Sequence, residues 1–354
     1  MKIVNVLFNK NLGGVAQAFL DYTESLIQQN HQVITIIHKD SKFINQLKKI
    51  NTKIYKVNNY LGYWDYPLIF QIRQILKKEK ASIAIAHAGR AISLTKKASV
   101  NFCPIIGVNH SNNVKRSLKC DAIFVVNSKI KETILKLNPK HKGRVFIIPN
   151  MIKPPKIKSS DTKQNDIITI GAAGRLSKEK GLEYLIQAAK ILQINKVDFQ
   201  IIIAGEGEER RSLENLIIKL KLQKHVKLLG WIKNMESFYS KIDTFCLPSL
   251  EETFGIVLLH AMLHKKAIVS TNTDGAKDIL KNNQDALIVS KQYLSKTHIH
   301  LAKALAELIF NKSLRKELSD NAYKKVNDKY TMDKVGKLIH DNIIEILTSE
   351  SKLF

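Results

Sequence analysis

Residues 248–278, PSLEETFGIVLLHAMLHKKAIVSTNTDGAKD, decide how this chain is organised. Pro248-Ser249 ends an apolar run, and apolar residues at helical spacing follow Thr253-Phe254-Gly255. A short apolar run over 267–269 indicates a buried strand, and Asp274-Gly275 is typical of a turn. The segment therefore predicts a turn, a helix, a strand and a second turn, which is the alternation of an α/β fold.

Two adjacent carboxylates, Glu251 and Glu252, precede the predicted start of this helix. Free backbone N–H groups and the helix dipole favour an anion such as a phosphate at a helix N-terminus. Carboxylates beside a helix N-terminus make sense if they bind the hydroxyls of a sugar while the N-terminus binds the phosphate of the same ligand. The segment thus indicates a site for a sugar phosphate.

The same segment resembles the signature of glycosyltransferase family 4, whose members are retaining enzymes with the two-domain GT-B fold. That signature has a Glu, then Gly-Phe-Gly, then a second Glu eight positions after the first. Here Glu252 takes the first position, Thr253-Phe254-Gly255 replaces the tripeptide, and His260 stands at the second Glu position. The resemblance implies that Glu252 is catalytic and orients the donor sugar, that Gly255 and Ile256 bind the donor diphosphate, and that His260 contacts the donor ribose. Alternatively, His260 only packs among its apolar helix neighbours.

The chain of 354 residues is long enough for two domains with separate cores, and its 44% hydrophobic content is that of a globular protein. No stretch approaches the ~18 apolar residues of a membrane span, and the first apolar run is shorter than a signal peptide needs. Three cysteines in or beside apolar runs, without metal-ligand spacing, indicate reduced core thiols: Cys103, Cys120 and Cys246. We expect a cytoplasmic protein that is at most peripheral on the inner face of the membrane.

The charge of the chain is unevenly distributed. Residues 1–165 carry 28 basic and 8 acidic residues, and residues 166–354 carry 29 and 23, so the formal charges are +20 and +6. A basic first half suggests an anionic partner such as a membrane surface. A lysine-rich genome bias would explain the total of +26 but not the asymmetry. Nucleic acid is disfavoured as a partner because the basic residues are dispersed, with few aromatics among them and no known binding motif.

In the first half, apolar runs alternate with helical patterns and predict a doubly wound parallel sheet. Gly13-Gly14 follows the first strand, and two glycines before a helix allow close backbone approach to a ligand, although a plain turn is an equal alternative. Polar clusters at 87–90 and 109–113 follow two further strands, where such sheets bind ligands. The resemblance implies that Gly13-Gly14 lines the cleft between the domains and that His110 is a catalytic residue at the donor sugar. A lone His in a loop is otherwise more often structural.

In the second half, Arg175 and Lys180 lie five positions apart in a loop before an amphipathic helix. Two fixed cations at the mouth of a sheet suit a diphosphate, since Arg binds it with two bonds and Lys as a point charge. A solvated basic loop is the alternative. The segment GRLSKEKG resembles the family's Gly-Arg-Leu…Lys-Gly motif, which implies that both cations hold the donor diphosphate. The resemblance also implies that the turn at Gly230 faces the nucleotide base.

The chain contains no Asp-x-Asp, Walker A or His-Glu-x-x-His motif. Metal-dependent sugar transfer generally uses an acidic pair to hold an ion on the diphosphate. Here Arg175, Lys180 and a helix N-terminus can supply that charge instead. We expect no metal and no cofactor, with the nucleotide diphosphate sugar as a substrate.

These features predict an α/β protein of GT-B fold, with two Rossmann-like parallel-sheet domains that face a cleft. The expected parts are an acceptor-binding domain over 1–152, a linker over 153–165, a nucleotide-sugar-binding domain over 166–331, and a last helix over 332–354 that packs back toward the first domain.

The expected enzyme is a hexosyltransferase-type glycosyltransferase. It moves a sugar, with retention, from a nucleotide diphosphate sugar to a hydroxyl of a glycan or lipid-linked acceptor in lipopolysaccharide or polysaccharide biosynthesis. The alternative is a non-catalytic nucleotide-sugar-binding protein, because the signature departs at His260, at Lys265 (usually Gly) and at Ala267 (usually Pro).

Overall fold

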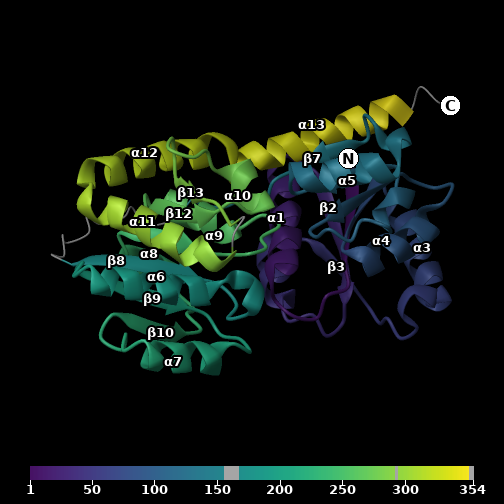
Figure 1. Cartoon of the computed structure of the whole chain (residues 1–354). Helices are drawn as coiled ribbons and strands as arrows, with labels where there is room; N and C mark the ends of the chain where they lie inside the picture. The colour runs from purple at the N-terminus through teal and green to yellow at the C-terminus, as the bar shows by residue number, and fades with distance from the viewer. Residues whose placement is uncertain (155–166, 292–293, 351–354) are drawn as a thin grey trace. The chain divides into compact units, whose positions relative to one another are not determined.

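The computed structural model describes residues 1–154, 167–291 and 294–350 (Figure 1). The chain forms two compact units. Unit 1 comprises Met1–Met151 and Thr331–Phe354, and unit 2 comprises Ile152–Tyr330. Residues 155–165 of the expected linker lie outside the described residues.

Unit 1 is built on a seven-stranded parallel sheet of order β3-β2-β1-β4-β5-β6-β7. Its strands are β1 (Lys2–Leu7), β2 (Gln32–His38), β3 (Lys53–Val57), β4 (Ile83–His87), β5 (Ile105–Asn109), β6 (Ala122–Val125) and β7 (Val145–Ile147). Its α-helices are α1 (Gly14–Gln28), α2 (Ile44–Ile50), α3 (Tyr66–Glu79), α4 (Gly89–Ser99), α5 (Ser128–Leu137) and α13 (Met332–Glu350).

Alternating side chains of the sheet bury against helices on opposite faces, because successive residues of a strand point to opposite sides. Val4 and Val6 join the core that α3 and α4 contribute to, whereas Ile3 joins the core with α1 and α13. The last helix buries Ile339 and Ile343 in this second core. The chain thus returns to unit 1 after completing unit 2.

Unit 2 is built on a six-stranded parallel sheet of order β10-β9-β8-β11-β12-β13. Its strands are β8 (Ile168–Ala173), β9 (Phe199–Ala204), β10 (Val226–Gly230), β11 (Thr244–Leu247), β12 (Ala267–Thr271) and β13 (Leu287–Val289). Its α-helices are α6 (Leu182–Ile194), α7 (Arg210–Lys219), α8 (Met235–Ser240), α9 (Ile256–Leu263), α10 (Asp274–Ile279), α11 (Thr297–Phe310) and α12 (Lys312–Lys329).

The predicted fold class is confirmed, since both units are doubly wound parallel sheets covered by helices. The three cysteines are buried, and none of them forms a disulfide in the part of the chain that the structure describes. The prediction of a turn at Asp274-Gly275 is wrong, because these residues begin helix α10. The hydroxyl of Thr273 caps this helix by accepting from the Ala276 N–H at 3.3 Å. A Thr before Asp-Gly therefore acted as a helix start and overrode the turn preference of the pair.

Candidate active site

The strand order of unit 2 brings together residues that are far apart in the sequence. Strands β8 and β11 are neighbours, and they form the topological switch point where the order of strands reverses. Arg175 and Lys180 follow β8, and Glu252 follows β11. Loops after parallel strands meet at the carboxyl edge, and ligands of such sheets bind at the switch point.

Lys180 and Glu252 form an ion pair at this edge. The Lys180 Nζ lies 2.7 Å from Glu252 Oε2, with 23% and 15% of the two side chains exposed. Arg175 is exposed, and its guanidinium makes no ion pair within the described part of the chain. The loop therefore carries two cations in different settings: Lys180 forms an ion pair with Glu252, and Arg175 faces solvent.

The backbones of these two loops are joined directly. The Glu179 carbonyl accepts from the N–H groups of Leu250, at 2.8 Å, and Glu251, at 3.2 Å. Gly181 has a φ of +59°, and a Cβ there would lie 2.2 Å from the Pro248 carbonyl oxygen. Only glycine permits this approach, so the Lys-Gly pair at 180–181 fixes the cation beside the loop of Glu252.

The carboxyl ends of β8, β9 and β10 also pack closely against one another. The Gly205 N–H donates to the Gly230 carbonyl at 2.8 Å, and the Gly174 N–H donates to the Ala204 carbonyl at 3.0 Å. A Cβ on Gly205 would lie 1.8 Å from the Gly174 carbonyl oxygen. Gly230 itself has a φ of +75° and ends β10 at the same edge.

The N-terminus of α9 has no side-chain cap. Gly255, at a φ of +92°, precedes Ile256, the first residue of the helix. The Glu252 carbonyl accepts from the Gly275 N–H at 2.9 Å, which holds the preceding loop against the start of α10. Uncapped N–H groups close to a Lys–Glu pair are suited to an anionic ligand.

His260 lies on α9 with its ring half-buried. The ring stacks on Tyr239, with centroids 5.9 Å apart and planes 10° apart, and the His260 carbonyl accepts from His264 Nδ1 at 2.8 Å. Burial, with a smaller contribution from the charge of His264, lowers the pKa of His260 to about 4. The imidazole is neutral at neutral pH and offers one donor and one acceptor. Its packing against Tyr239 agrees with the alternative that was open at this position.

In unit 1, His110 pairs with a second histidine. His87 Nδ1 lies 3.1 Å from His110 Nε2, and the two rings stack with centroids 5.4 Å apart. His87 ends β4 and is fully buried, whereas His110 follows the neighbouring strand β5. Burial lowers the pKa of His110 to about 4. The sequence predicted both loops as candidate ligand-binding positions, but it could not show that the two histidine rings are in contact.

The lowered pKa of His110 gives a pH prediction. A histidine titrates near 6.5 in an unfolded chain, so protons favour the unfolded state once the pH falls below that value. The stability contributed by neutral His110 is complete above pH 6.5 and is lost as the pH falls toward 4. We expect the denaturant midpoint of unit 1 to fall across this window and to fall less steeply in His110→Gln. An identical pH profile for the two proteins would contradict the assignment.

Gly13 lies on the exposed loop between β1 and α1, and Gly14 is the exposed first residue of α1. A Cβ at either position would meet nothing within 4 Å. Packing within unit 1 therefore does not require glycine at either position. A requirement for glycine would have to come from a ligand.

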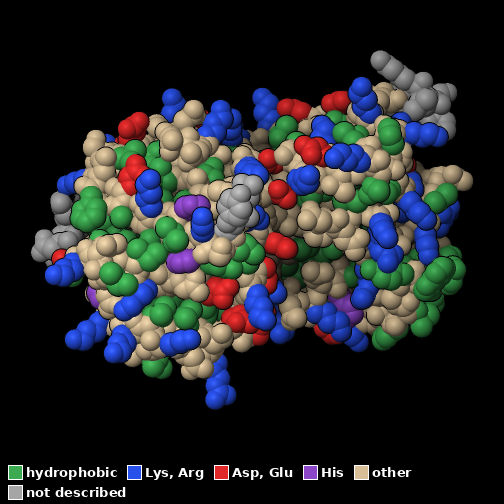
Figure 2. All heavy atoms as spheres, in the orientation of Figure 1, with side chains coloured by type: hydrophobic (Ala, Val, Ile, Leu, Met, Phe, Trp, Pro, Cys, Tyr) green, Lys and Arg blue, Asp and Glu red, His purple; other side chains and the backbone are tan. Residues whose placement is uncertain are grey.

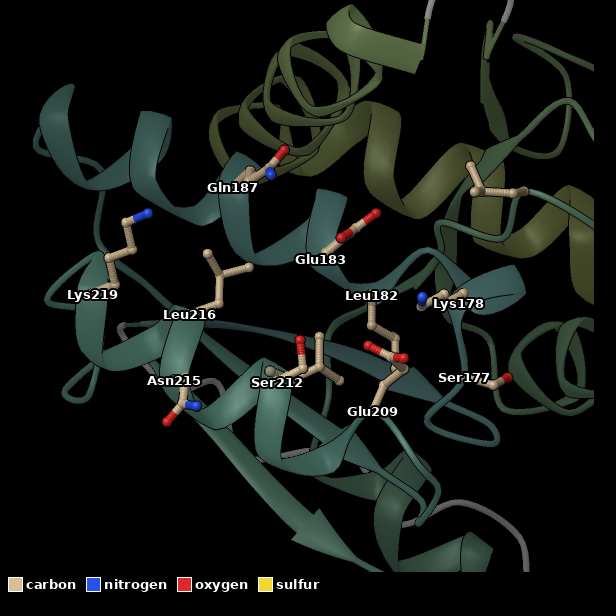
Figure 3. Close-up of a pocket in the computed structure, with 12 residues that line it drawn as sticks. Ser177, Lys178, Leu182, Glu183, Gln187, Glu209, Ser212, Asn215, Leu216 and Lys219 are labelled. Carbon is tan, nitrogen blue, oxygen red and sulfur yellow. The ribbon is translucent and has the colours of Figure 1, made fainter.

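A cavity of about 610 Å³ lies between α6 and α7 (Figure 3). It touches the candidate site through Ser177, Lys178 and Leu250, but its walls contain two carboxylates, Glu183 and Glu209. In Figure 3, Glu183 comes from α6 and Glu209 from the segment just before α7. Lys178 and Lys219 also line the cavity, so its charged side chains balance and it lacks the net positive charge that suits a diphosphate. The candidate donor site is therefore the loop edge beside this cavity, where Arg175 and Lys180 lie.

Neither a metal-binding cluster nor a membrane-spanning helix is found among the described residues. None of their His, Cys, Asp and Glu side chains form a group of three placed to hold a metal ion. The expectation that the reaction needs no metal stays a prediction. Among the same residues, no helix is long and apolar enough to cross a membrane.

Two doubly wound parallel-sheet units, with the last helix returned to the first, make up the GT-B fold. The sequence profile of "Glycosyltransferase Family 4" matches residues 12–154, and that of "Glycosyl transferases group 1" matches residues 153–325. The chain belongs to glycosyltransferase family 4. The resemblance inferred from the sequence is thereby confirmed.

A sequence relative agrees with this family, and solved structures agree with the fold. The chain is 26% identical to the GalNAc-α-(1→4)-GalNAc-α-(1→3)-diNAcBac-PP-undecaprenol α-1,4-N-acetyl-D-galactosaminyltransferase of Campylobacter jejuni, over 93% of this chain and 94% of that protein. A glycosyltransferase from Rickettsia africae has a TM-score of 0.82 at 19% identity, covering 98% of both chains. Anabaena HepE in complex with UDP and glucose has a TM-score of 0.82 at 17% identity, covering 97% of this chain and 99% of that one.

The structure therefore brings six of the predicted residues to one edge of unit 2. These are Arg175, Lys180, Gly230, Glu252, Gly255 and Ile256. His260 lies one helical turn further along α9, and His110, Gly13 and Gly14 belong to unit 1. Glu179 and Gly181 were missed as structural parts of the site. Only the Lys-Gly pair at 180–181 gave a signal for them, because it implies a left-handed turn.

Proposed function

We propose that the protein transfers a hexose-type sugar from a nucleotide diphosphate sugar to a hydroxyl of a glycan or lipid-linked acceptor. The observation that carries the proposal is the Lys180–Glu252 pair at the switch point of unit 2, beside Arg175 and the uncapped end of α9. The reaction proceeds with retention and without a metal or cofactor. It belongs to the assembly of lipopolysaccharide or another surface glycan, at the cytoplasmic face of the membrane. The Campylobacter relative is named for an acceptor linked to undecaprenol through a diphosphate, which supports this class of acceptor.

Lys180 can serve two ligands at once because an ammonium group has three N–H donors. One N–H holds Oε2 of Glu252, which leaves Oε1 to accept from hydroxyls of the donor sugar. The remaining N–H groups point a positive charge at the diphosphate, together with Arg175 and the N–H groups at Gly255 and Ile256. The ion pair thus orients Glu252 before the donor arrives.

In the reaction, the bond between the anomeric carbon and the diphosphate oxygen breaks, and a bond from the acceptor oxygen forms. The negative charge that develops on the leaving diphosphate is stabilised by Arg175, Lys180 and the helix N-terminus. The leaving phosphate takes the acceptor proton, so no separate carboxylate base is required. His110 and the Gly13-Gly14 loop contact the donor sugar, and Gly230 faces the base.

A transfer assay tests this function. Labelled nucleotide sugars are incubated with the protein and with lipid extracts or purified glycan acceptors. We expect one nucleotide sugar to give a labelled product, and Glu252→Gln to reduce the rate about hundredfold, because the neutral amide no longer pairs with Lys180 and the donor sugar is misplaced. Full activity of Glu252→Gln would contradict the role of this carboxylate.

The second candidate is a non-catalytic nucleotide-sugar-binding protein. It is favoured by His260, whose ring packs on Tyr239 in place of the family's second carboxylate. The two candidates differ in turnover. Donor binding by calorimetry, with no nucleoside diphosphate released in the presence of any acceptor tested, would select the binding protein.

His260 also gives a prediction for ribose binding. A carboxylate accepts from two ribose hydroxyls, whereas a neutral imidazole accepts from one. We expect His260→Glu to bind the preferred nucleoside diphosphate more tightly, and His260→Ala to bind it more weakly by about 1 kcal/mol, the net value of one hydrogen bond. Calorimetry on both variants measures this. Unchanged affinity in both would mean that His260 only packs.

A further inference from the structure

Unit 1 exposes a dense group of large hydrophobic side chains on and just before α3. We name this group, together with two residues that follow α4, the aromatic surface. Its members are Tyr60, Leu61, Trp64, Tyr66, Phe70, Val100 and Phe102, with exposed fractions between 38% and 75%. Figure 2 shows hydrophobic side chains gathered along the edge of the molecule where Figure 1 places α3, with Lys and Arg side chains nearby. Exposed apolar patches of this kind mark interaction sites.

The segment that carries these side chains is held rigidly from beneath. The buried carboxylate of Asp65 accepts from the N–H groups of Tyr60, at 2.8 Å, and Leu61, at 3.2 Å. It also caps α3 through the Leu68 N–H at 3.2 Å. Arg73 donates to the Val100 carbonyl at 3.1 Å and so fastens α3 to the segment after α4. The apolar side chains are therefore presented outward by an ordered backbone.

The charge around the aromatic surface is positive. Residues 60–102 contain seven basic and two acidic residues. Both acids are buried and engaged, since Asp65 caps α3 and Glu79 accepts from Lys53 at 2.6 Å. Lys97 Nζ lies 4.6 Å from the centroid of the Trp64 ring and so places a cation beside the exposed indole.

The aromatic surface borders the carboxyl edge of the unit 1 sheet. Tyr63, which lies between its members, has the Arg116 guanidinium carbon 3.4 Å from its ring centroid and that of Arg90 at 5.8 Å. Arg90 follows His87 by three residues, and His87 touches His110. A partner bound at the aromatic surface would therefore lie next to the loops proposed to face the sugar.

We propose that the aromatic surface docks at the headgroup level of an anionic bilayer and so presents a lipid-linked acceptor to this edge. The inference rests on the proposed function for the nature of the acceptor. Tyr and Trp are the side chains that favour the membrane–water interface, and cations beside them are attracted by anionic lipid. A second copy of the chain is a poorer occupant, because symmetric pairing would set positive charge against positive charge.

The two tryptophans of the chain provide a matched pair of reporters, since Trp64 lies in the aromatic surface and Trp231 lies in unit 2. In Trp231→Phe, we expect the Trp64 emission to shift to shorter wavelength with vesicles of phosphatidylcholine and phosphatidylglycerol, and to be quenched by brominated acyl chains. In Trp64→Phe, we expect no shift of Trp231, although its side chain is 76% exposed. A Trp64 emission that does not respond, or an equal response of the two reporters, would overturn the proposal.

Sedimentation with the same vesicles measures the contribution of the surface. We expect Trp64→Ser/Phe70→Ser to reduce the partition coefficient by about tenfold or more, because it removes two interfacial aromatic side chains. The control Trp231→Ser/Phe310→Ser removes two side chains of similar exposure from unit 2 and should leave binding unchanged. Equal binding by both variants would overturn the proposal.

Charge variants test the choice of lipid. Lys77→Gln/Lys78→Gln, on α3, should weaken binding to the anionic vesicles by about fivefold per lysine, equivalent to ~1 kcal/mol each. Lys219→Gln/Lys224→Gln is the control in unit 2. Equal binding to pure phosphatidylcholine, or self-association that shields Trp64 without vesicles, would contradict docking on an anionic bilayer. Nucleotide binding, measured separately, distinguishes failure of this surface from failure of the proposed function.

Discussion

Lys180→Ala is expected to weaken the binding of a nucleoside diphosphate by about tenfold or more while leaving the parent nucleoside unchanged. A charge-assisted hydrogen bond contributes about 1.5–3 kcal/mol, and only the diphosphate receives it. The substitution also leaves the half-buried Glu252 without its partner at 2.7 Å. Calorimetric titration with a nucleoside and its diphosphate measures the two affinities.

Lys178→Ala is the matched control for this prediction. Lys178 lies two residues away, is exposed, and points into the cavity between α6 and α7 rather than to Glu252. Its removal should change neither affinity. Equal losses of affinity in Lys178→Ala and Lys180→Ala would mean that the loop acts only as a diffuse basic surface. If Lys180→Ala lost equal affinity for the nucleoside and for its diphosphate, Lys180 would not be part of the diphosphate site.

Gly205→Ala is expected to destabilise unit 2 by about 3 kcal/mol, the upper part of the range for forced overpacking. Its Cβ would lie 1.8 Å from the Gly174 carbonyl oxygen, and its φ of +142° disfavours any L side chain. Because the contact is with backbone, no rotamer change relieves it. Denaturant unfolding of the variant and the parent, followed by circular dichroism, measures the difference.

Gly14→Ala is the control for the glycine substitution. A Cβ there meets nothing within 4 Å, and the residue begins helix α1, where alanine is preferred to glycine. We expect no loss of stability. An unfolding midpoint of Gly205→Ala equal to that of the parent would show that the loops after β8 and β9 do not pack as described.

The sequence was sufficient for the fold because both units repeat strong local patterns. Strand β9, FQIIIA, is a short apolar run, and helix α5, SKIKETILKL, places Ile130 and Ile134 one turn apart on its buried face. Each pattern is set by burial at a period of two or 3.6 residues, which depends little on the rest of the chain. Helix α10 was missed because it is short and its start, Thr-Asp-Gly, is also a turn sequence.

The site was predictable as a set of residue types but not as an arrangement. Lys180 and Glu252 are 72 positions apart, and their contact exists only because β11 lies beside β8 in the sheet. The His87–His110 pair likewise depends on β4 and β5 being neighbours. Local sequence does not encode the order of strands. The resemblance to family 4 supplied the roles, and the strand order supplied the contacts.

The central claim, that the loop edge of unit 2 binds a nucleotide diphosphate sugar, is tested most directly by a thermal-shift panel of nucleosides, nucleoside diphosphates and their sugars. A ligand at 100 times its dissociation constant stabilises the folded protein by about 2.7 kcal/mol. We expect one base series to stabilise the protein, with the diphosphate and its sugar far more effective than the nucleoside. Stabilisation by no nucleotide, or equal stabilisation by nucleoside and diphosphate, would contradict the claim.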